Sequence, residues 1–146
     1  MAILEKRFAF EDTIHLKPGE YAFRENDENR DLFIIQDGVV EIVKQTPQGE
    51  IMLTEFVKGE FFGDMALLQG GPRFAGARAK TACRLLVLRP GGFLLKIRRD
   101  PTFAFEMLQQ LSQRIKVSNE RLFTVIQKGG ISKDTAQEIF NAINGR

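Results

Sequence analysis

Short apolar runs alternate with turn signals between Thr13 and Leu88, and this pattern constrains the fold of the chain more than any other feature. The turn signals are Pro18-Gly19, Asp37-Gly38, residues 46–49 and residues 58–60. Asp37-Gly38 is a dipeptide typical of two-residue hairpins, so we expect residues 32–35 and 39–43 to form one hairpin. Strands this short, separated at such regular spacing, predict an antiparallel sandwich or barrel.

The hydrophobic period changes after residues 89–92, which read Arg-Pro-Gly-Gly. Asp100 is a good N-cap and Pro101 a good first helical residue, so a long helix is predicted from this point to Gly129-Gly130. Ser132 can cap a final short helix. Apolar residues with one polar member, Ser118, follow at alternating steps of three and four, as in a coiled-coil seam. They are Leu108, Leu111, Ile115, Ser118, Leu122 and Val125.

Two interpretations of this stripe stay open. It can pack against its own domain, or it can pair with a partner helix. Both are possible for one helix, because apolar residues off the seam can face the β-rich body. These are Phe103, Met107, Phe123 and Ile126.

Length and composition exclude several classes of protein. A chain of 146 residues is one domain by the usual length relation. Its 43% hydrophobic and 27% charged residues argue against disorder and against a membrane span. In the N-terminal MAILEKRF the first charged residue is already Glu5, which leaves too short an apolar stretch for a signal peptide. Cys83 is the only cysteine in the sequence, so it cannot form an internal disulfide. We therefore expect a cytoplasmic protein.

The net charge of +2 and the absence of any basic run beyond Arg98-Arg99 argue against a nucleic-acid-binding face. The sequence also argues against the common classes of enzyme. His15 is the only histidine, whereas barrel metalloenzymes of the cupin type generally need at least two imidazoles. Cys83 is most simply a small core residue. The sequence contains no GxxxxGK, GxGxxG, GxSxG or HExxH motif. We expect no catalysis and no metal site.

Residues 61–79, FFGDMALLQGGPRFAGARA, are the candidate ligand-binding segment. Phe61-Phe62 can anchor the segment, and Gly63 lets the backbone approach a ligand. Asp64 can accept hydrogen bonds from a hydroxyl group. Residues 65–68 are compatible with one helical turn whose free N–H groups attract an anion. Arg73 adds a planar donor for phosphate. This set suits a phosphorylated ribose; the alternative is a surface loop with an incidental acid and arginine.

The segment resembles the phosphate-binding cassette of the cyclic nucleotide-binding domain family, FGE-hydrophobic-ALL-x(3–4)-PR-x-A-[TS]-x-x-A. The matching residues are Phe62, Gly63, Ala66, Leu67, Leu68, Pro72, Arg73, Ala75 and Ala79. The stretches LKPGEYAFRENDENRDLFIIQDGVVEI and FVKGEFFGD resemble the segments that precede that cassette. The resemblance implies a mainly β fold, an eight-stranded antiparallel jelly roll followed by a long helix and a short terminal helix.

The resemblance also implies a role for each cassette residue. Arg73 would pair with the exocyclic oxygens of a cyclic phosphate, and the backbone N–H groups of Ala66 and Phe74 would donate to the same group. Gly63 and Asp64 would bind the ribose 2′-hydroxyl. Met65 and Ala75 complete the predicted ligand-binding set in the cassette.

Two positions depart from the family pattern. Asp64 replaces the usual glutamate, so its reach falls by about one C–C bond, ~1.5 Å. A hydrogen bond to a charged group contributes roughly 1.5–3 kcal/mol, and losing part of it would weaken binding around tenfold. Gly76 replaces the usual Thr or Ser, whose hydroxyl often contacts guanine or phosphate. Its absence argues mildly against cyclic GMP.

The stretch DPTFAFEMLQQLSQRIKVSNERL is similar to the dimer helix of the catabolite activator family of regulators. The resemblance places Ser118 and Asn119 at adenine-contacting positions and Arg114 near the site. It also implies a homodimer through the helix around Leu108, Leu111, Ile115 and Leu122. The alternative is that Ser118 only sets the helix register or is tolerated there.

We therefore expect a nucleotide-binding roll with its long helix over residues 1–128 and a short helical tail over residues 129–146. That tail is too small for a helix-turn-helix, so direct DNA binding is not expected. The expected function is a cyclic nucleotide sensor, for cAMP and possibly cGMP, that signals to an unidentified protein partner. The alternatives are a nucleotide-free interaction module and the regulatory fragment of a transcription factor.

Overall fold

A computed structural model describes residues 11–145, so the N-terminal MAILEKRF lies outside the described residues. Contacts divide the chain into two units, Met1–Ala104 and Phe105–Arg146. These units are defined by contacts within the chain, whereas the boundary expected at residue 128 separates a nucleotide-binding domain from a tail. That boundary stays a prediction. Each unit is described by itself below.

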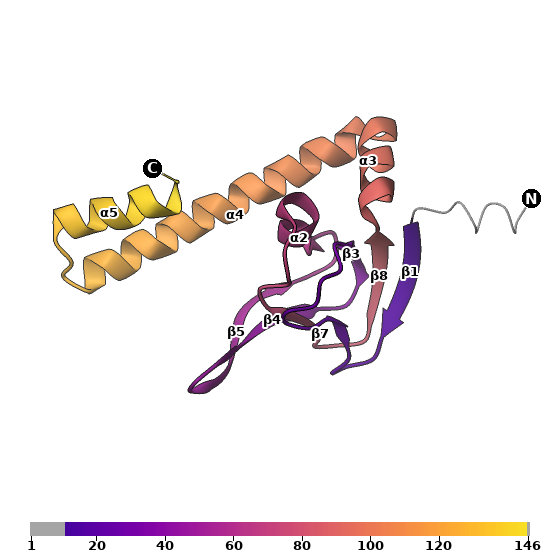
Figure 1. The fold of residues 1–146 in the computed structure, drawn as a ribbon, viewed down its shortest axis with the longest axis horizontal. Coiled ribbons are helices and arrows are strands. Elements are labelled where there is room, and N and C mark those ends of the chain that lie inside the picture. The colour runs from indigo at the N-terminus through magenta and orange to yellow at the C-terminus, as the bar shows by residue number, and fades with distance from the viewer. Residues whose placement is uncertain (1–10, 146) are drawn as a thin grey trace, which may run out of the picture. The chain divides into compact units, whose positions relative to one another are not determined.

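Two antiparallel four-stranded sheets form the first unit (Figure 1). One sheet has the order β1-β8-β3-β6 and the other β2-β7-β4-β5. The strands are β1 (Glu11–Leu16), β2 (Tyr21–Phe23), β3 (Leu32–Asp37), β4 (Val40–Thr46), β5 (Gly49–Phe56), β6 (Phe61–Phe62), β7 (Gly76–Ala79) and β8 (Cys83–Leu88). Helix α2 (Asp64–Gln69) lies between β6 and β7 in the chain, and α3 (Pro90–Arg99) follows β8. The predicted roll of eight antiparallel strands is confirmed.

The hydrophobic core draws on strands of both sheets. Its buried members are Phe23, Phe33, Ile35, Val40, Phe62, Ala77, Ala79, Cys83, Leu85 and Val87. The rings of Phe33 and Phe62 stack with centroids 5.1 Å apart, and Phe23 packs 5.7 Å from Phe33. Phe61 and Phe62 are 2% and 1% exposed, so they anchor the cassette as predicted. Cys83 is a small core residue, also as predicted.

The hairpin predicted at Asp37-Gly38 is wrong. The chain does turn there, with Gly38 at a φ of 95°, but β3 pairs with β6 and β8 while β4 pairs with β5 and β7. The two strands therefore enter different sheets. The turn predicted at residues 46–49 is confirmed, and it closes the β4–β5 hairpin.

Helix α4 (Pro101–Lys128) starts in the first unit and continues through the second, where α5 (Lys133–Ile143) follows it. Both predicted caps are confirmed. The carboxylate of Asp100 accepts a hydrogen bond from the Phe103 N–H at 3.1 Å, and the Ser132 hydroxyl accepts one from the Thr135 N–H at 3.3 Å. No helix within residues 11–145 is long and apolar enough to cross a bilayer.

The apolar side chains of α4 differ in how much of their surface is exposed. Leu108, Ile115 and Val125 of the predicted seam are 63%, 60% and 63% exposed. Of the off-seam residues, Met107 and Ile126 are buried, whereas Phe123 is 52% exposed. Leu111 and Leu122 of the same seam are half-buried, so the apolar stripe is exposed over part of its length.

Candidate functional site

Gly63 is the bend that joins β6 to α2. Its φ is 87°, in the left-handed region that disfavours residues with a side chain. A Cβ atom at this position would lie 2.8 Å from the carbonyl oxygen of Asp31 and 3.0 Å from the NH1 atom of Arg73. Both the backbone angle and the space therefore require glycine, whereas the approach of a ligand to Gly63 stays a prediction.

Arg73 follows the turn after α2 and is buried, with 3% of its surface exposed. Its NH1 group donates to the Gly63 carbonyl at 2.9 Å. Its NH2 group donates to Asn29 Oδ1 at 2.5 Å and to the Asp31 carbonyl at 2.7 Å. The Nε–H is buried and has no hydrogen-bond partner among the described residues. Three of the five guanidinium N–H donors are thus used, and the buried Nε–H and the second N–H of the NH1 group are left without an acceptor among the described residues.

Among the described residues, the charge of Arg73 also lacks a direct counterion. Its acceptors are two carbonyl groups and one amide, and no carboxylate in residues 11–145 forms an ion pair with it. The guanidinium carbon lies 4.0 Å from the centre of the Phe23 ring and 6.0 Å from that of Phe33, where cation–π attraction holds it. Burial lowers the pKa of Arg73, and the more distant negative charges of Asp31, Asp27 and Asp64 oppose that effect.

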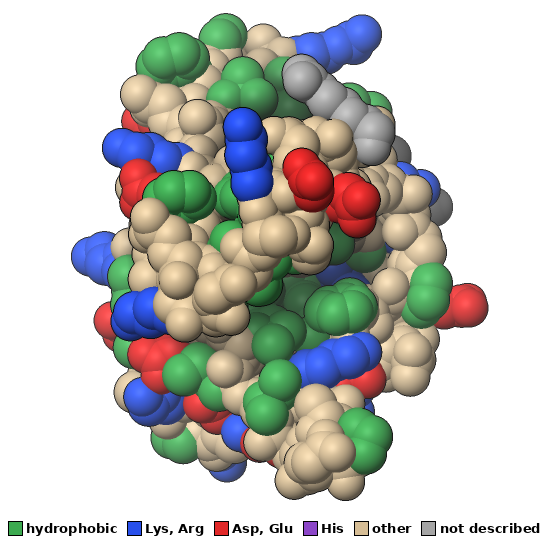
Figure 2. Space-filling model, turned by 90° about the vertical axis from the view of Figure 1, so that its left-hand side faces the viewer, with side chains coloured by type: hydrophobic (Ala, Val, Ile, Leu, Met, Phe, Trp, Pro, Cys, Tyr) green, Lys and Arg blue, Asp and Glu red, His purple; other side chains and the backbone are tan. Residues whose placement is uncertain are grey.

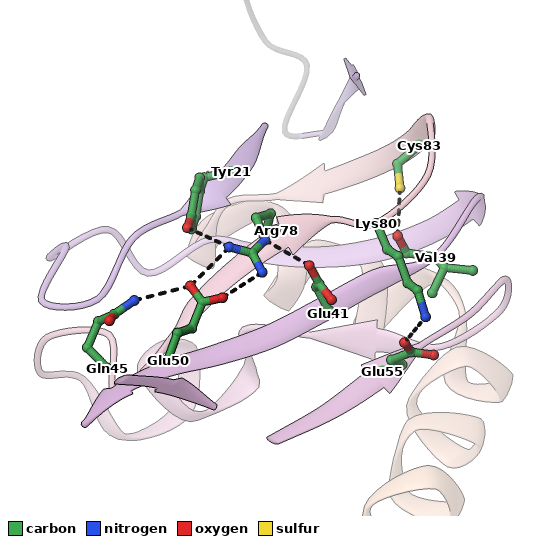
Figure 3. A network of polar contacts seen from close by, with 9 residues as sticks. All are labelled: Tyr21, Val39, Glu41, Gln45, Glu50, Glu55, Arg78, Lys80 and Cys83. Carbon is green, nitrogen blue, oxygen red and sulfur yellow. Dashed lines mark hydrogen bonds and ion pairs between the residues drawn. The ribbon is translucent and has the colours of Figure 1, made fainter. Parts of the chain in front are cut away.

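A second arginine in the cassette, Arg78 on β7, shows the opposite arrangement (Figure 3). Its guanidinium donates to Glu41 at 2.8 Å, to Glu50 at 2.8 Å and to the Tyr21 hydroxyl at 3.2 Å. Hydrogen bonds to Glu50 and Glu41 raise the pKa of Arg78. Its charge is neutralised within the protein, so Arg78 is a structural residue and Arg73 is the candidate for an external anion.

Backbone donors lie in the same segment. The N–H groups of Ala66, in the first turn of α2, and of Phe74, next to Arg73, form no hydrogen bond with any described residue. These are the two amides predicted to bind phosphate. Met65 and Phe74 are 61% and 62% exposed, whereas Ala75 is 6% exposed. Asp64, at the start of α2, is half-buried. The cassette thus offers amide donors and one buried cation.

Tyr21 explains why Gly76 departs from the family pattern. A Cβ atom on Gly76 would lie 3.2 Å from Cε1 of the Tyr21 ring, which is tighter than an ordinary contact. The ring thus occupies space that a serine or threonine side chain would need. The sequence marked Gly76 as unusual but held no signal for Tyr21 as the neighbour that fills its place.

A sequence profile of the cyclic nucleotide-binding domain matches residues 13–100. The chain belongs to this family.

Relatives of this cyclic nucleotide-binding domain include a channel and a kinase subunit. It is 32% identical over 133 residues to potassium/sodium hyperpolarization-activated cyclic nucleotide-gated channel 1 of Oryctolagus cuniculus, covering 87% of the chain and 15% of the channel. It is 32% identical over 82 residues to the cAMP-dependent protein kinase regulatory subunit of Emericella nidulans, covering 56% of the chain and 19% of that protein. The domain therefore spans a small part of the length of these relatives.

Solved structures share the fold. The N-terminal domain of a transcriptional regulator from Streptomyces coelicolor is 27% identical, with a TM-score of 0.59 and 82% of each chain covered. The catabolite activator protein of Thermus thermophilus is 22% identical, with a TM-score of 0.68, covering 97% of this chain and 82% of that one. The second likeness concerns the fold alone.

The remaining predicted site residues lie on α4 in the second unit. Arg114 and Asn119 are half-buried and Ser118 is exposed. Arg114 donates to Gln110 Oε1, one turn earlier in the same helix, at 3.5 Å. The contact of these three side chains with a nucleotide base stays a prediction.

Sequence reasoning missed the residues that support the cassette from outside. Asn29, in the loop between β2 and β3, accepts a hydrogen bond from Arg73, and no motif in the sequence marked this residue. Lys44 on β4 donates to the Phe74 carbonyl at 2.7 Å and to Glu25 at 3.2 Å, and its ammonium lies 4.2 Å from the centre of the Phe74 ring. No spacing rule links positions so far apart in the chain.

The surface is not strongly basic on the face drawn in Figure 2. Lysine and arginine side chains there are interspersed with acidic and apolar ones. This face therefore lacks the continuous basic patch that nucleic-acid binding requires.

Proposed function

We propose that this domain is a cyclic nucleotide sensor that binds cAMP, with cGMP as a weaker ligand. The observation that carries the proposal is the state of Arg73, which is buried, has no ion-paired carboxylate among the described residues and keeps a buried Nε–H without an acceptor. A buried charge without a counterion is costly, so an anion that reaches it is strongly favoured. A cyclic phosphate supplies that charge.

The amides of Ala66 and Phe74 complete the proposed phosphate site. Both lack a partner among the described residues and belong to the segments that flank the turn before Arg73. Asp64 then accepts a hydrogen bond from the ribose 2′-hydroxyl. Because its side chain is one methylene shorter than glutamate, we expect Asp64→Glu to tighten binding and Asp64→Ala to weaken it.

Binding of the nucleotide biases the position of the C-terminal helix in this proposal. Arg114, Ser118 and Asn119 on α4 contact the base, and two copies of the chain pair through the exposed stripe that includes Leu108 and Ile115. A ligand shifts such an equilibrium only by its differential affinity for the two helix positions. The signal passes to a protein partner in the cytoplasm.

Titration calorimetry with cAMP and cGMP tests the proposal. Loss of two charge-assisted hydrogen bonds in Arg73→Ala predicts at least about a hundredfold weaker binding. Arg73→Lys, which keeps the charge but loses the planar donor group, is expected to fall between this variant and the parent. Arg84→Ala is the matched control, since Arg84 is an exposed arginine on β8. Unchanged affinity in Arg73→Ala would refute the proposed phosphate site.

Sedimentation velocity tests the dimer. Leu111→Glu places a charge in the seam and is expected to reduce the sedimenting mass to that of one chain. An unaltered mass would exclude this seam as the dimer contact.

A nucleotide-free interaction module is the second candidate function. The NH1 and NH2 groups of Arg73 already have acceptors within the protein, so the folded domain holds the arginine in place without a ligand. Absence of heat with either nucleotide at millimolar concentration would favour this module over the sensor.

A further inference from the structure

Three consecutive residues in the loop between β2 and β3 contact the cassette at two separate points. Asn29 Oδ1 and the Asp31 carbonyl accept hydrogen bonds from Arg73 NH2. Arg30, between them, points its donors at α2 instead. Its Nε donates to the Ala66 carbonyl at 3.1 Å and its NH2 to the Leu67 carbonyl at 2.7 Å. We name residues 29–31 the clamp loop.

The backbone of the β2–β3 loop just before the clamp loop also holds Arg73. The Asn26 N–H donates to the Arg73 carbonyl at 2.8 Å, and the Arg73 N–H donates to the Asp27 carbonyl at 2.7 Å. Arg73 is therefore fixed to this loop through both its main chain and its side chain. Any shift of the loop relative to α2 would change the separation of Arg73 from the first turn of that helix.

Helix α2 needs an external support at its C-terminal end. It has only six residues, and its last turn contains no basic side chain. Carbonyl groups in the last turn of a helix lack intrahelical partners and attract cations. The Ala66 carbonyl accepts a hydrogen bond from the Gly70 N–H at 2.9 Å as well as from Arg30. Arg30 thus supplies from the clamp loop the positive charge that α2 lacks.

We propose that Arg30 is a positioning residue for the anion site. It holds α2 in the position relative to Arg73 in which the Ala66 N–H and the Arg73 guanidinium can bind the same phosphate. The proposal rests on the proposed function of that site, where the buried and unpartnered Nε of Arg73 points to an anionic ligand. Arg30 itself donates to α2 carbonyls and acts on the ligand only through the helix.

Arg30→Gln tests the proposal in nucleotide titrations. We expect roughly tenfold weaker binding of both cAMP and cGMP, less than in Arg73→Ala, because the two lost hydrogen bonds support α2 and affect the ligand only indirectly. The ratio of the two affinities should not change, since α2 contacts neither base. Arg30→Lys keeps one charged donor and should restore part of the affinity. Arg24→Gln is the matched control: Arg24 flanks the same loop, but its guanidinium lies over the Tyr21 ring at 4.0 Å.

Amide hydrogen exchange of the nucleotide-free protein separates this inference from the proposed function. Arg30→Gln should exchange faster over residues 64–69 while the β4–β5 hairpin exchanges as in the parent. If the parent binds no nucleotide, the proposed function fails, and faster exchange at α2 would still support the clamp. If Arg30→Gln binds nucleotide like the parent, or leaves exchange at α2 unchanged, the positioning role is refuted.

Discussion

Substitution of Gly63 by alanine is expected to destabilise the domain through two separable effects. The first is the backbone angle, since a φ of 87° costs a residue with a Cβ about 1–2 kcal/mol. Alanine recovers about 0.4–1 kcal/mol by restricting the unfolded chain. The net effect of the angle alone is therefore about 1 kcal/mol of lost stability.

The second effect is a steric clash. The new Cβ would lie 2.8 Å from the Asp31 carbonyl oxygen and 3.0 Å from Arg73 NH1. Neither group can move freely, because the Asp31 carbonyl accepts a hydrogen bond from Arg73 NH2 and Arg73 NH1 donates one to the Gly63 carbonyl. Forcing an extra carbon into such a site typically costs about 1–3 kcal/mol. Gly63→Ala should then lose about 2–4 kcal/mol in total.

Gly19→Ala separates the two effects. Gly19 has nearly the same angle, a φ of 89°, but a Cβ there would meet nothing within 4 Å. Urea unfolding followed by circular dichroism should show a loss of about 1 kcal/mol in this control. With a slope of about 2 kcal/mol per M, the two midpoints should differ by roughly 1 M. Equal midpoints would refute the argument that the approach of Asp31 and Arg73 makes Gly63 necessary.

Three further outcomes are expected. Gly76→Ser should displace the Tyr21 ring at a cost of about 1 kcal/mol, which fluorescence reports directly because the chain has one tyrosine and no tryptophan. A hydrogen bond from the Gln45 N–H lowers the pKa of Glu25, so its contribution to stability is present above the unfolded pKa and lost as the pH falls through the folded one. Acid titrations of Glu25→Gln should lack this loss; a parent-like profile would contradict it. Burial raises the pKa of the Cys83 thiol, so thiol reagents should label it only upon unfolding, and fast labelling of the native protein would contradict its place in the core.

Local signals in the sequence were reliable where the physics is local. Asp100 and Ser132 cap their helices through residues three positions away, as the sequence predicted. Such interactions depend on a few neighbouring residues, so a short stretch contains all the information needed. Helix α3 was missed because the Pro-Gly-Gly at its start reads as a turn, although proline is favourable in the first turn of a helix.

Pairing of strands was less predictable. Asp37-Gly38 correctly indicated a reversal of the chain but wrongly indicated a hairpin. A turn dipeptide favours a backbone conformation, and it contains no information on whether the next strand stays in the same sheet. The sequence likewise did not predict the contact between the clamp loop and the cassette, because Asn29 and Arg73 are 44 positions apart.

The sequence by itself determined that one arginine and a glycine-rich turn lie in one short segment of a β-rich chain and predicted that this segment binds an anion, because those residue types and their spacing are local properties. Only the tertiary structure decided which arginine has no ion-pair partner within residues 11–145. Arg73 and Arg78 are both arginines of one segment, yet Glu41 and Glu50 reach Arg78 across the sheet while Arg73 enters the core between Phe23 and neutral acceptors. Charge compensation depends on distances across strands, and those distances exist only once the sheets have formed.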